Sequence, residues 1–168
     1  MTKSQNIVTS ITVEIEAPAS VVWKVLTDLD RYSEWNTFCP GIKSTLKLGD
    51  PVTMTVKSPN SDELGTAVEY LVCFEPEQLL SWEARPTAES KAAARRDQYV
   101  QALGPERCSY VTTDVFLGPI ADDLMKNIGS WAKAGFDDVA RGLKRQAEAI
   151  YAQQKARITV RPVSGGAP

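Results

Sequence analysis

The stretch GPIADDLMKNIGSWAKAGFDDVARGLKRQAEAIYAQQ, residues 118–154, decides the fold. After the turn-forming pair Gly118-Pro119, apolar side chains recur at steps of three or four residues, which is the period of an α-helix. They are Leu124, Ile128, Trp131, Gly135, Phe136, Val139, Leu143, Ala147 and Ile150. Acidic residues near its start and basic residues near its end complement the helix macrodipole. The sequence therefore predicts one helix of roughly 35 residues, about 50 Å long.

Upstream of this helix, residues 42–117 alternate between strand-like runs and turn residues. Gly-Asp-Pro, Pro-Asn, Glu-Pro-Glu and Gly-Pro-Glu sequences separate the runs, and connections this short join antiparallel neighbours. Residues 86–94 form a longer, Ala-rich and polar stretch, interpreted as a mobile loop or an extra helical turn. Six strands are expected, over residues 42–48, 52–57, 66–74, 78–85, 95–103 and 107–117.

The N-terminal part supplies a further strand and two short helices. Residues 7–16 alternate between apolar and polar side chains, as a half-buried strand does. Pro18 suits the first turn of a helix ending near Asp30, and a second helical turn follows over residues 31–36. The predicted fold is α+β: a curved antiparallel sheet of about seven strands wrapped around the long C-terminal helix. We expect residues 1–156 to form a single domain, residues 157–168 a flexible tail, and the sheet and helix to enclose a ligand cavity.

The composition excludes several classes of function. The chain has 168 residues, no histidine, and 19 basic against 21 acidic residues, for a formal charge of −2. A charge this close to zero argues against binding of nucleic acid or of an anionic membrane. The absence of histidine removes His-dependent triads and His-ligated metal sites, so neither a metal nor another cofactor is expected.

The cysteines and the N-terminus indicate a cytoplasmic protein. Cys39, Cys73 and Cys108 are odd in number and widely spaced, which favours buried reduced thiols over disulfides or a zinc site. Residues 1–10 lack the apolar core of a signal peptide, and no stretch is long enough to span a membrane. The oligomeric state stays open.

Five short motifs, in order, resemble the START-like or SRPBCC helix-grip superfamily, in its polyketide cyclase/dehydrase branch. The resemblance runs from about residue 8 to residue 152. Family members bind hydrophobic small molecules between sheet and helix, and some cyclise or dehydrate their ligand while others only carry it. The motifs are APASVVW (17–23), LTDLDRYSEWN (26–36), Pro76 through Trp82, DVFLG (114–118), and Phe136 followed by LKRQAE (143–148).

Three functions are therefore considered. The first is a cofactor-free cyclase, aromatase or dehydratase acting on a polyketide-like or terpenoid-like substrate. The second is a non-catalytic carrier of a lipid, sterol or quinone, which the absence of histidine slightly favours. The third is a structural or partner-binding domain with an incidental cavity.

Several side chains are candidates for binding the ligand, and each also has a purely structural interpretation. Asn36 either donates and accepts hydrogen bonds to a ligand or caps a helix end. The aromatic residues either line a pocket or fill the core. The candidates for substrate binding are Tyr32, Trp35, Trp82, Tyr110, Phe116, Asn127 and Trp131.

The candidates for catalysis are Tyr99, Asp114, Arg96 and Asn36. Aromatase/cyclases of the superfamily are thought to use a cavity arginine and tyrosine, and the resemblance offers Arg96 and Tyr99 for these parts. Strand parity places residues 96 and 99 on opposite faces unless a bulge intervenes, and we take Tyr99 first. Asp114 is either a partly buried general base, a surface acid or a partner for Arg96.

Overall fold

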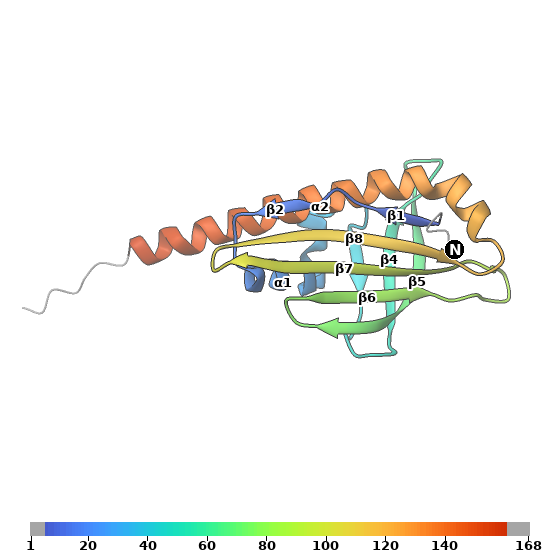
Figure 1. Ribbon diagram of the computed structural model, residues 1–168, viewed down its shortest axis with the longest axis horizontal. Coiled ribbons are helices and arrows are strands. Elements are labelled where there is room, and N and C mark those ends of the chain that lie inside the picture. Colours follow the sequence, from blue (N-terminus) through green and yellow to red (C-terminus); the bar gives the residue numbers. More distant parts are fainter. Residues whose placement is uncertain (1–5, 161–168) are drawn as a thin grey trace, which may run out of the picture.

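Helix α2, Ala121–Thr159, lies along one side of an eight-stranded antiparallel sheet (Figure 1). The computed structural model describes residues 6–160. The strands are β1 (Ile7–Thr9), β2 (Val13–Ile15), β3 (Gly41–Lys43), β4 (Pro51–Lys57), β5 (Leu64–Glu75), β6 (Leu79–Ala84), β7 (Ala93–Gly104) and β8 (Arg107–Leu117). The short helices are α1 (Ala19–Thr27) and the 3-10 helix η1 (Leu29–Glu34). The predicted helix-grip fold is confirmed.

The strand order is β1-β8-β7-β6-β5-β4-β3, and β2 also pairs with β8. β1 and β2 thus share one edge, so the sheet is seven strands wide at any level. The inner face carries the even-numbered residues of β4, β6, β7 and β8, together with Ala67, Glu69 and Leu71 of β5. Buried apolar side chains of this face pack against α1, η1 and α2 to form the core.

The first strand is interrupted, whereas the sequence predicted one strand over residues 7–16. The Ser10 hydroxyl accepts a hydrogen bond from the Thr112 N–H at 3.0 Å, and the Ile11 N–H donates to the Asp137 carboxylate of α2 at 2.7 Å. The side chain of Asp137 therefore takes a backbone group that a continuous strand would give to the sheet. The chain turns toward the helix between β1 and β2 for this reason.

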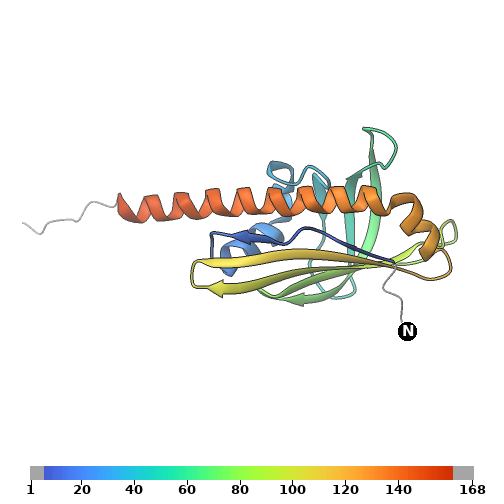
Figure 2. The same cartoon turned by 45° about the horizontal axis from the view of Figure 1, so that its top comes forward.

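Two other predicted boundaries were wrong. β3 ends at Lys43 rather than at residue 48, because Leu46 adopts a left-handed backbone with φ of 57° that no strand accommodates. Helix α2 runs past residue 154 through Thr159, so three residues of the expected tail are helical. Its last turns extend beyond the sheet (Figure 2). Residues 161–168, the rest of that tail, lie outside the described residues.

Two glycines let α2 approach the segment that follows η1. A Cβ atom on Gly142 would lie 2.2 Å from the carbonyl oxygen of Trp35, and one on Gly135 would lie 2.3 Å from the ring of Phe38. Real Cβ atoms do not come this close to other atoms. Glycine is therefore required at both positions for the observed packing.

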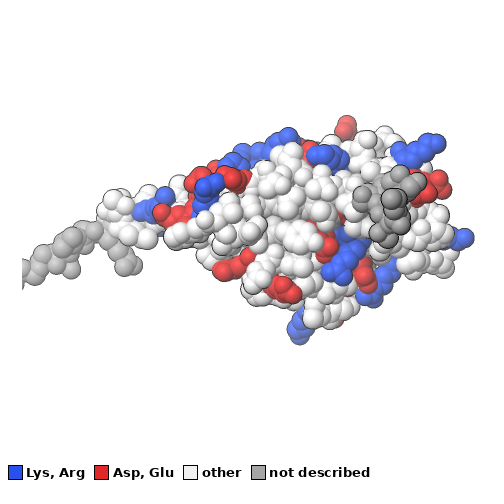
Figure 3. Space-filling view, viewed as in Figure 1, with Lys and Arg blue, Asp and Glu red and all other residues white. Residues whose placement is uncertain are grey.

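Charges of both signs are interspersed over the face shown in Figure 3. Within residues 6–160, no helix is both long and apolar enough to cross a membrane.

Candidate functional site

A cavity of about 310 Å³ lies between the first half of α2 and the inner face of the sheet. Its walls are mostly apolar, with aromatic rings from Trp82, Phe116, Trp131 and Phe136. The space exists because small side chains face it where larger ones would meet. These are Ala67, Ala84, Ala94 and Ala132.

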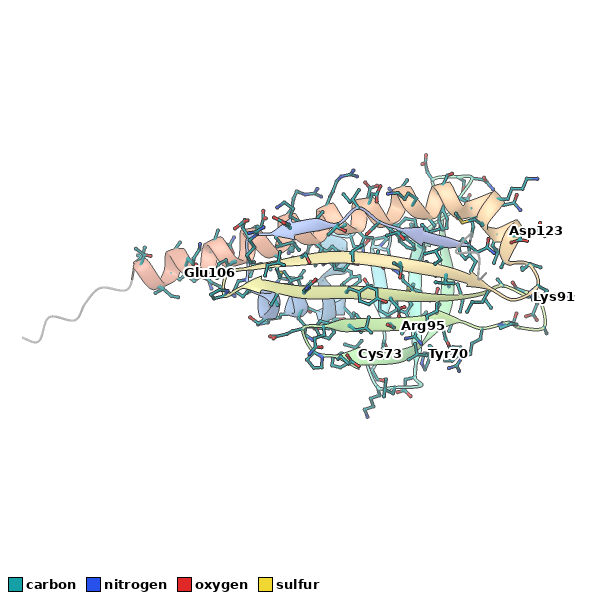
Figure 4. The ribbon with its side chains drawn as sticks, viewed as in Figure 1. Tyr70, Cys73, Lys91, Arg95, Glu106 and Asp123 are labelled. Atoms are coloured by element: carbon teal, nitrogen blue, oxygen red, sulfur yellow. The ribbon has the colours of Figure 1, made fainter. Side chains whose placement is uncertain are left out.

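The mouth of the cavity is formed by three segments that are far apart in the sequence. Residues 57–59 and 65–66 come from the β4–β5 hairpin, residues 92 and 93 precede or begin β7, and Leu124 and Ile128 come from α2. Lys91 and Asp123 mark the same end of the molecule in Figure 4. The Ala-rich segment before β7 thus reaches the mouth, and it forms a loop rather than a helical turn.

Two polar side chains, Arg96 and Asp114, lie beside Trp82 on the mostly apolar wall that the sheet gives to the cavity. Trp82, Arg96 and Asp114 are direct neighbours on β6, β7 and β8. Arg96 is only 7% exposed, and its guanidinium carbon lies 4.3 Å from the centre of the Phe136 ring. A cation over an aromatic face is stabilised by the ring quadrupole, which partly offsets the cost of burying the charge.

Thr112 orients the Arg96 guanidinium. Arg96 Nε donates to the Thr112 hydroxyl at 3.1 Å, and that hydroxyl donates its own hydrogen to the carbonyl oxygen of Asp97 at 2.8 Å. Because the hydroxyl hydrogen of Thr112 is donated to Asp97, the Thr112 oxygen can only accept a hydrogen bond from Arg96. Arg96 Nη2 is buried and has no hydrogen-bond partner among the described residues, so it is free to donate into the cavity.

Two carboxyl groups face this arginine. Burial raises the pKa of Asp114 to about 6, the positive charge of Arg96 opposes the shift, and Asp97 adds to it. Burial also raises the pKa of Glu69 to about 7, reinforced by the negative charge of Asp114 and opposed by Arg96. The Oδ1 atom of Asp114 is buried without a hydrogen-bond partner within residues 6–160. Both carboxyl groups therefore have a pKa closer to neutral than an ordinary carboxylate, as groups that serve as acid or base do.

The structure brings five of the predicted site residues to this cavity. They are Trp82, Arg96, Asp114, Phe116 and Trp131. Tyr110 shares the inner face but lies deeper, fully buried, and its hydroxyl donates to Gln98 at 2.8 Å. Asn127 is exposed on α2 and does not line the cavity, because its position falls between the residues that face the sheet.

Tyr99 lies on the opposite face of the sheet from Arg96, contrary to the expectation that it would lead the site. Its side chain is 40% exposed, and its hydroxyl donates to Asp97 at 3.3 Å. No bulge interrupts β7 between residues 96 and 99, so strand parity holds. Arg95 and Cys73, labelled in Figure 4, lie in the same outer region of the sheet.

Tyr32, Trp35 and Asn36 also lie outside the cavity lining, where they complete the core. The Tyr32 hydroxyl donates to the carbonyl of Leu26 at 2.5 Å, and its ring packs edge-on against Trp35. Asn36 is buried, and its side-chain oxygen accepts a hydrogen bond from the N–H of Cys39 at 2.8 Å. Asn36 therefore stabilises the turn after η1, and its side chain neither lines the cavity nor caps a helix end.

The sequence analysis missed Glu69 and Phe38. Glu69 stands between Val68 and Tyr70 in a strand-like run, and a carboxylate interrupting such a run is the signal that was available. Phe38 lies in a segment with neither helical nor strand periodicity, so nothing in the local sequence shows which way its ring points.

The fold and its cavity define a helix-grip protein with a site for an apolar ligand. Residues 6–148 match the family described as "Polyketide cyclase / dehydrase and lipid transport", and the chain belongs to this family.

Solved structures support the same fold. A START superfamily protein from Mycobacterium smegmatis is 14% identical, with a TM-score of 0.63, covering 86% of this chain and 98% of that one. The Zhui aromatase/cyclase from Streptomyces sp. R1128 is 20% identical, with a TM-score of 0.56, covering 96% and 98%.

One curated protein shows a short local match. "Oxopyrrolidines biosynthesis cluster protein O" from Penicillium oxalicum is 59% identical over 27 residues. These residues are 16% of this chain and 13% of that protein, so the match spans only a small part of either.

Proposed function

We propose that this protein is a cofactor-free cyclase, aromatase or dehydratase for a compact polyketide-like or terpenoid-like substrate. The observation that carries the proposal is the meeting of Arg96, Asp114 and Glu69 inside an apolar cavity. Buried polar groups without partners cost stability, and proteins retain them mainly where a ligand completes the hydrogen bonds. Arg96 Nη2 and Asp114 Oδ1 are two such atoms on neighbouring strands.

The three groups can divide the work of an enolisation followed by cyclisation or loss of water. A substrate carbonyl oxygen accepts a hydrogen bond from Arg96, whose charge stabilises the enolate that forms. Ionised Asp114 removes the proton from the adjacent carbon. Protonated Glu69 then donates to the oxygen that becomes a hydroxyl or leaves as water. The proton taken by Asp114 returns to Glu69 through solvent at the open mouth.

The cavity size and the relatives agree with this proposal. A volume of about 310 Å³ is at the small end for ligand pockets, which favours a compact substrate folded within the walls. The Zhui protein is titled an aromatase/cyclase, and the Penicillium protein is named for a biosynthesis cluster.

Turnover of aromatic β-hydroxy ketones tests the proposal, because their dehydration gives conjugated enones that absorb in the near ultraviolet. We expect Asp114→Asn to lower kcat by about 10²-fold or more while binding of the ketone changes little. Asp30→Asn, the same substitution at an exposed site, serves as the matched control. Equal turnover by the unchanged protein and Asp114→Asn contradicts the assignment of Asp114 as base.

The second candidate is a non-catalytic carrier, which the largely apolar walls and the lipid-transport part of the family description favour. A carrier binds through apolar burial, so Trp82→Ala and Trp131→Ala weaken binding while Asp114→Asn does not. Saturable binding without turnover of any ketone in the panel supports this alternative.

A further inference from the structure

Phe38 occupies an unusual position between α2 and the sheet. Its ring covers Gly135, and its centre lies 5.0 Å from the ring of Trp131 and 5.8 Å from that of Phe136. The side chain is only 7% exposed. Phe38 is therefore part of an aromatic cluster, held against Gly135, a helix position that has no side chain.

The same ring lies between two hollows. Phe38 and Trp131 line both the inner cavity of about 310 Å³ and a surface groove of about 520 Å³, as do residues 57–59 of the β4–β5 hairpin. This outer groove lies between the β4–β5 hairpin and the middle of α2. Its other walls are mainly polar, and they include Asn60, Asp62 and Asp138. Two hollows that share lining side chains are separated by those side chains.

The peptide group that joins Phe38 to Cys39 is hydrogen-bonded through both its oxygen and its N–H. The Phe38 carbonyl oxygen accepts a hydrogen bond from the N–H of Lys57 at 3.1 Å, and the next residue is held by Asn36 through the Cys39 N–H. The ring is thus attached to a rigid segment, and shortening the side chain would remove the wall without moving the chain.

We infer that Phe38 determines the length of ligand that the cavity accepts. The inference rests on the proposed function only in that an apolar ligand must enter the cavity. A ligand that fills the inner space meets the Phe38 ring, and further carbon atoms have no buried surface to occupy. Without the ring, the cavity continues into the outer groove, where a longer chain finds room.

A series of 2-alkanones from six to fourteen carbons tests this inference, with binding followed by the fluorescence of Trp82 and Trp131. Each methylene that is buried strengthens binding about fourfold. In the unchanged protein, we expect the affinity to rise with length and then level off. In Phe38→Ala, the rise continues for about two or three more carbons, so the longest ketones bind roughly 16- to 64-fold tighter than to the unchanged protein.

Two further variants make the result decisive. Phe38→Leu keeps most of the buried volume, so it is expected to extend the length limit by less than Phe38→Ala does. It replaces Phe38→Ala in the experiment if that variant does not fold. Phe74→Ala is the matched control, because Phe74 packs on Trp23 and lines neither hollow.

The possible outcomes separate the inference from the proposed function. An unchanged length limit in folded Phe38→Ala or Phe38→Leu overturns the inference alone. An equal extension in Phe74→Ala overturns it too, because general loosening would then explain the effect. Failure of every 2-alkanone to bind the unchanged protein overturns both the proposed apolar site and the role of Phe38.

Discussion

The two halves of helix α2 meet the rest of the molecule in different ways. From Val139 to Ala147, buried side chains fill the space between the helix and the sheet: Leu143 and Val139 pack against the short helices and the sheet, and Gly142 lies against the backbone of Trp35. Before Gly135, Leu124 and Ile128 face the cavity and are only partly buried. One continuous helix therefore serves as core at one end and as the wall of a binding site at the other.

The difference comes from the size of the side chains opposite the helix. The half of α2 before Gly135 faces the small side chains of Ala67, Ala84 and Ala94 on the sheet. The other half belongs to the part of the core that holds the larger side chains of Leu26, Val22 and Tyr110. The strands and their pairing continue through both regions. A helix-grip fold thus creates a cavity by placing small residues at one end, without any change of backbone architecture.

Leucine truncations on the two halves are expected to give the largest contrast. Leu143→Ala leaves a void in a filled region and should lower the free energy of unfolding by about 3–4 kcal/mol. Leu124→Ala enlarges a space that is already open and should cost about 1 kcal/mol. Urea unfolding of both variants measures the two costs. Similar losses for both would show that the two halves are equally well packed.

Replacing a glycine of α2 by alanine in each half compares how closely the helix backbone approaches its neighbours. Gly142→Ala forces a methyl group onto the Trp35 carbonyl and should cost about 2–3 kcal/mol. At Gly129, the nearest atom is the sulfur of the flexible Met125 side chain, at 3.0 Å, so Gly129→Ala should be within about 1 kcal/mol of neutral. Thermal unfolding compares them. A neutral Gly142→Ala would contradict the close contact at the filled end.

The pH dependence of stability reports on the open half. The pKa of Glu69 is about 7 in the folded protein, above its ordinary value, so the folded state binds more protons than the unfolded state between about pH 4 and 7. The contribution of Glu69 to the free energy of unfolding therefore falls as the pH rises through this range.

Removing that carboxylate should stabilise the protein at high pH. Glu69→Gln is expected to be more stable by about 1–2 kcal/mol at pH 8, with little difference below pH 4. Asp114 stays in place opposite Arg96 in this variant. Urea midpoints at pH 4 and pH 8 test it, with the exposed Glu63→Gln as control. A parallel pH profile in Glu69→Gln and the unchanged protein would falsify the burial of this charge.

The smallest effect is expected on the outer face of the sheet. Tyr99→Phe removes one partly exposed hydrogen bond to Asp97 and should change stability by less than about 0.5 kcal/mol. Binding and turnover should not change, because the side chain lies across the sheet from the cavity. A clear loss of turnover in Tyr99→Phe would contradict this placement.

The periodicity of the sequence predicted much of the fold. The helical face of residues 124–150, the strand order implied by short turns, and the two short helices are all present. The interruption of the first strand depends on a contact between distant residues, the hydrogen bond from Ile11 to Asp137. Local patterns contain no information about such a contact.

Strand parity also predicted that Arg96 and Tyr99 would lie on opposite faces, but not which face would be concave. That choice depends on where α2 packs, and it brings Arg96 and Asp114 to the cavity while leaving Tyr99 outside. For the same reason, the sequence offered Trp82 and Phe116 as pocket or core residues without deciding between them.

The sequence by itself determined the elements, their order and the two faces of each strand, because these follow from periods of two and 3.6 residues. Only the tertiary structure decided that Glu69, Arg96 and Asp114 share one apolar space and that Phe38 closes it. These residues meet through strand register and through the close approach of α2 at Gly135. Register and packing depend on the whole chain at once, and so does the site.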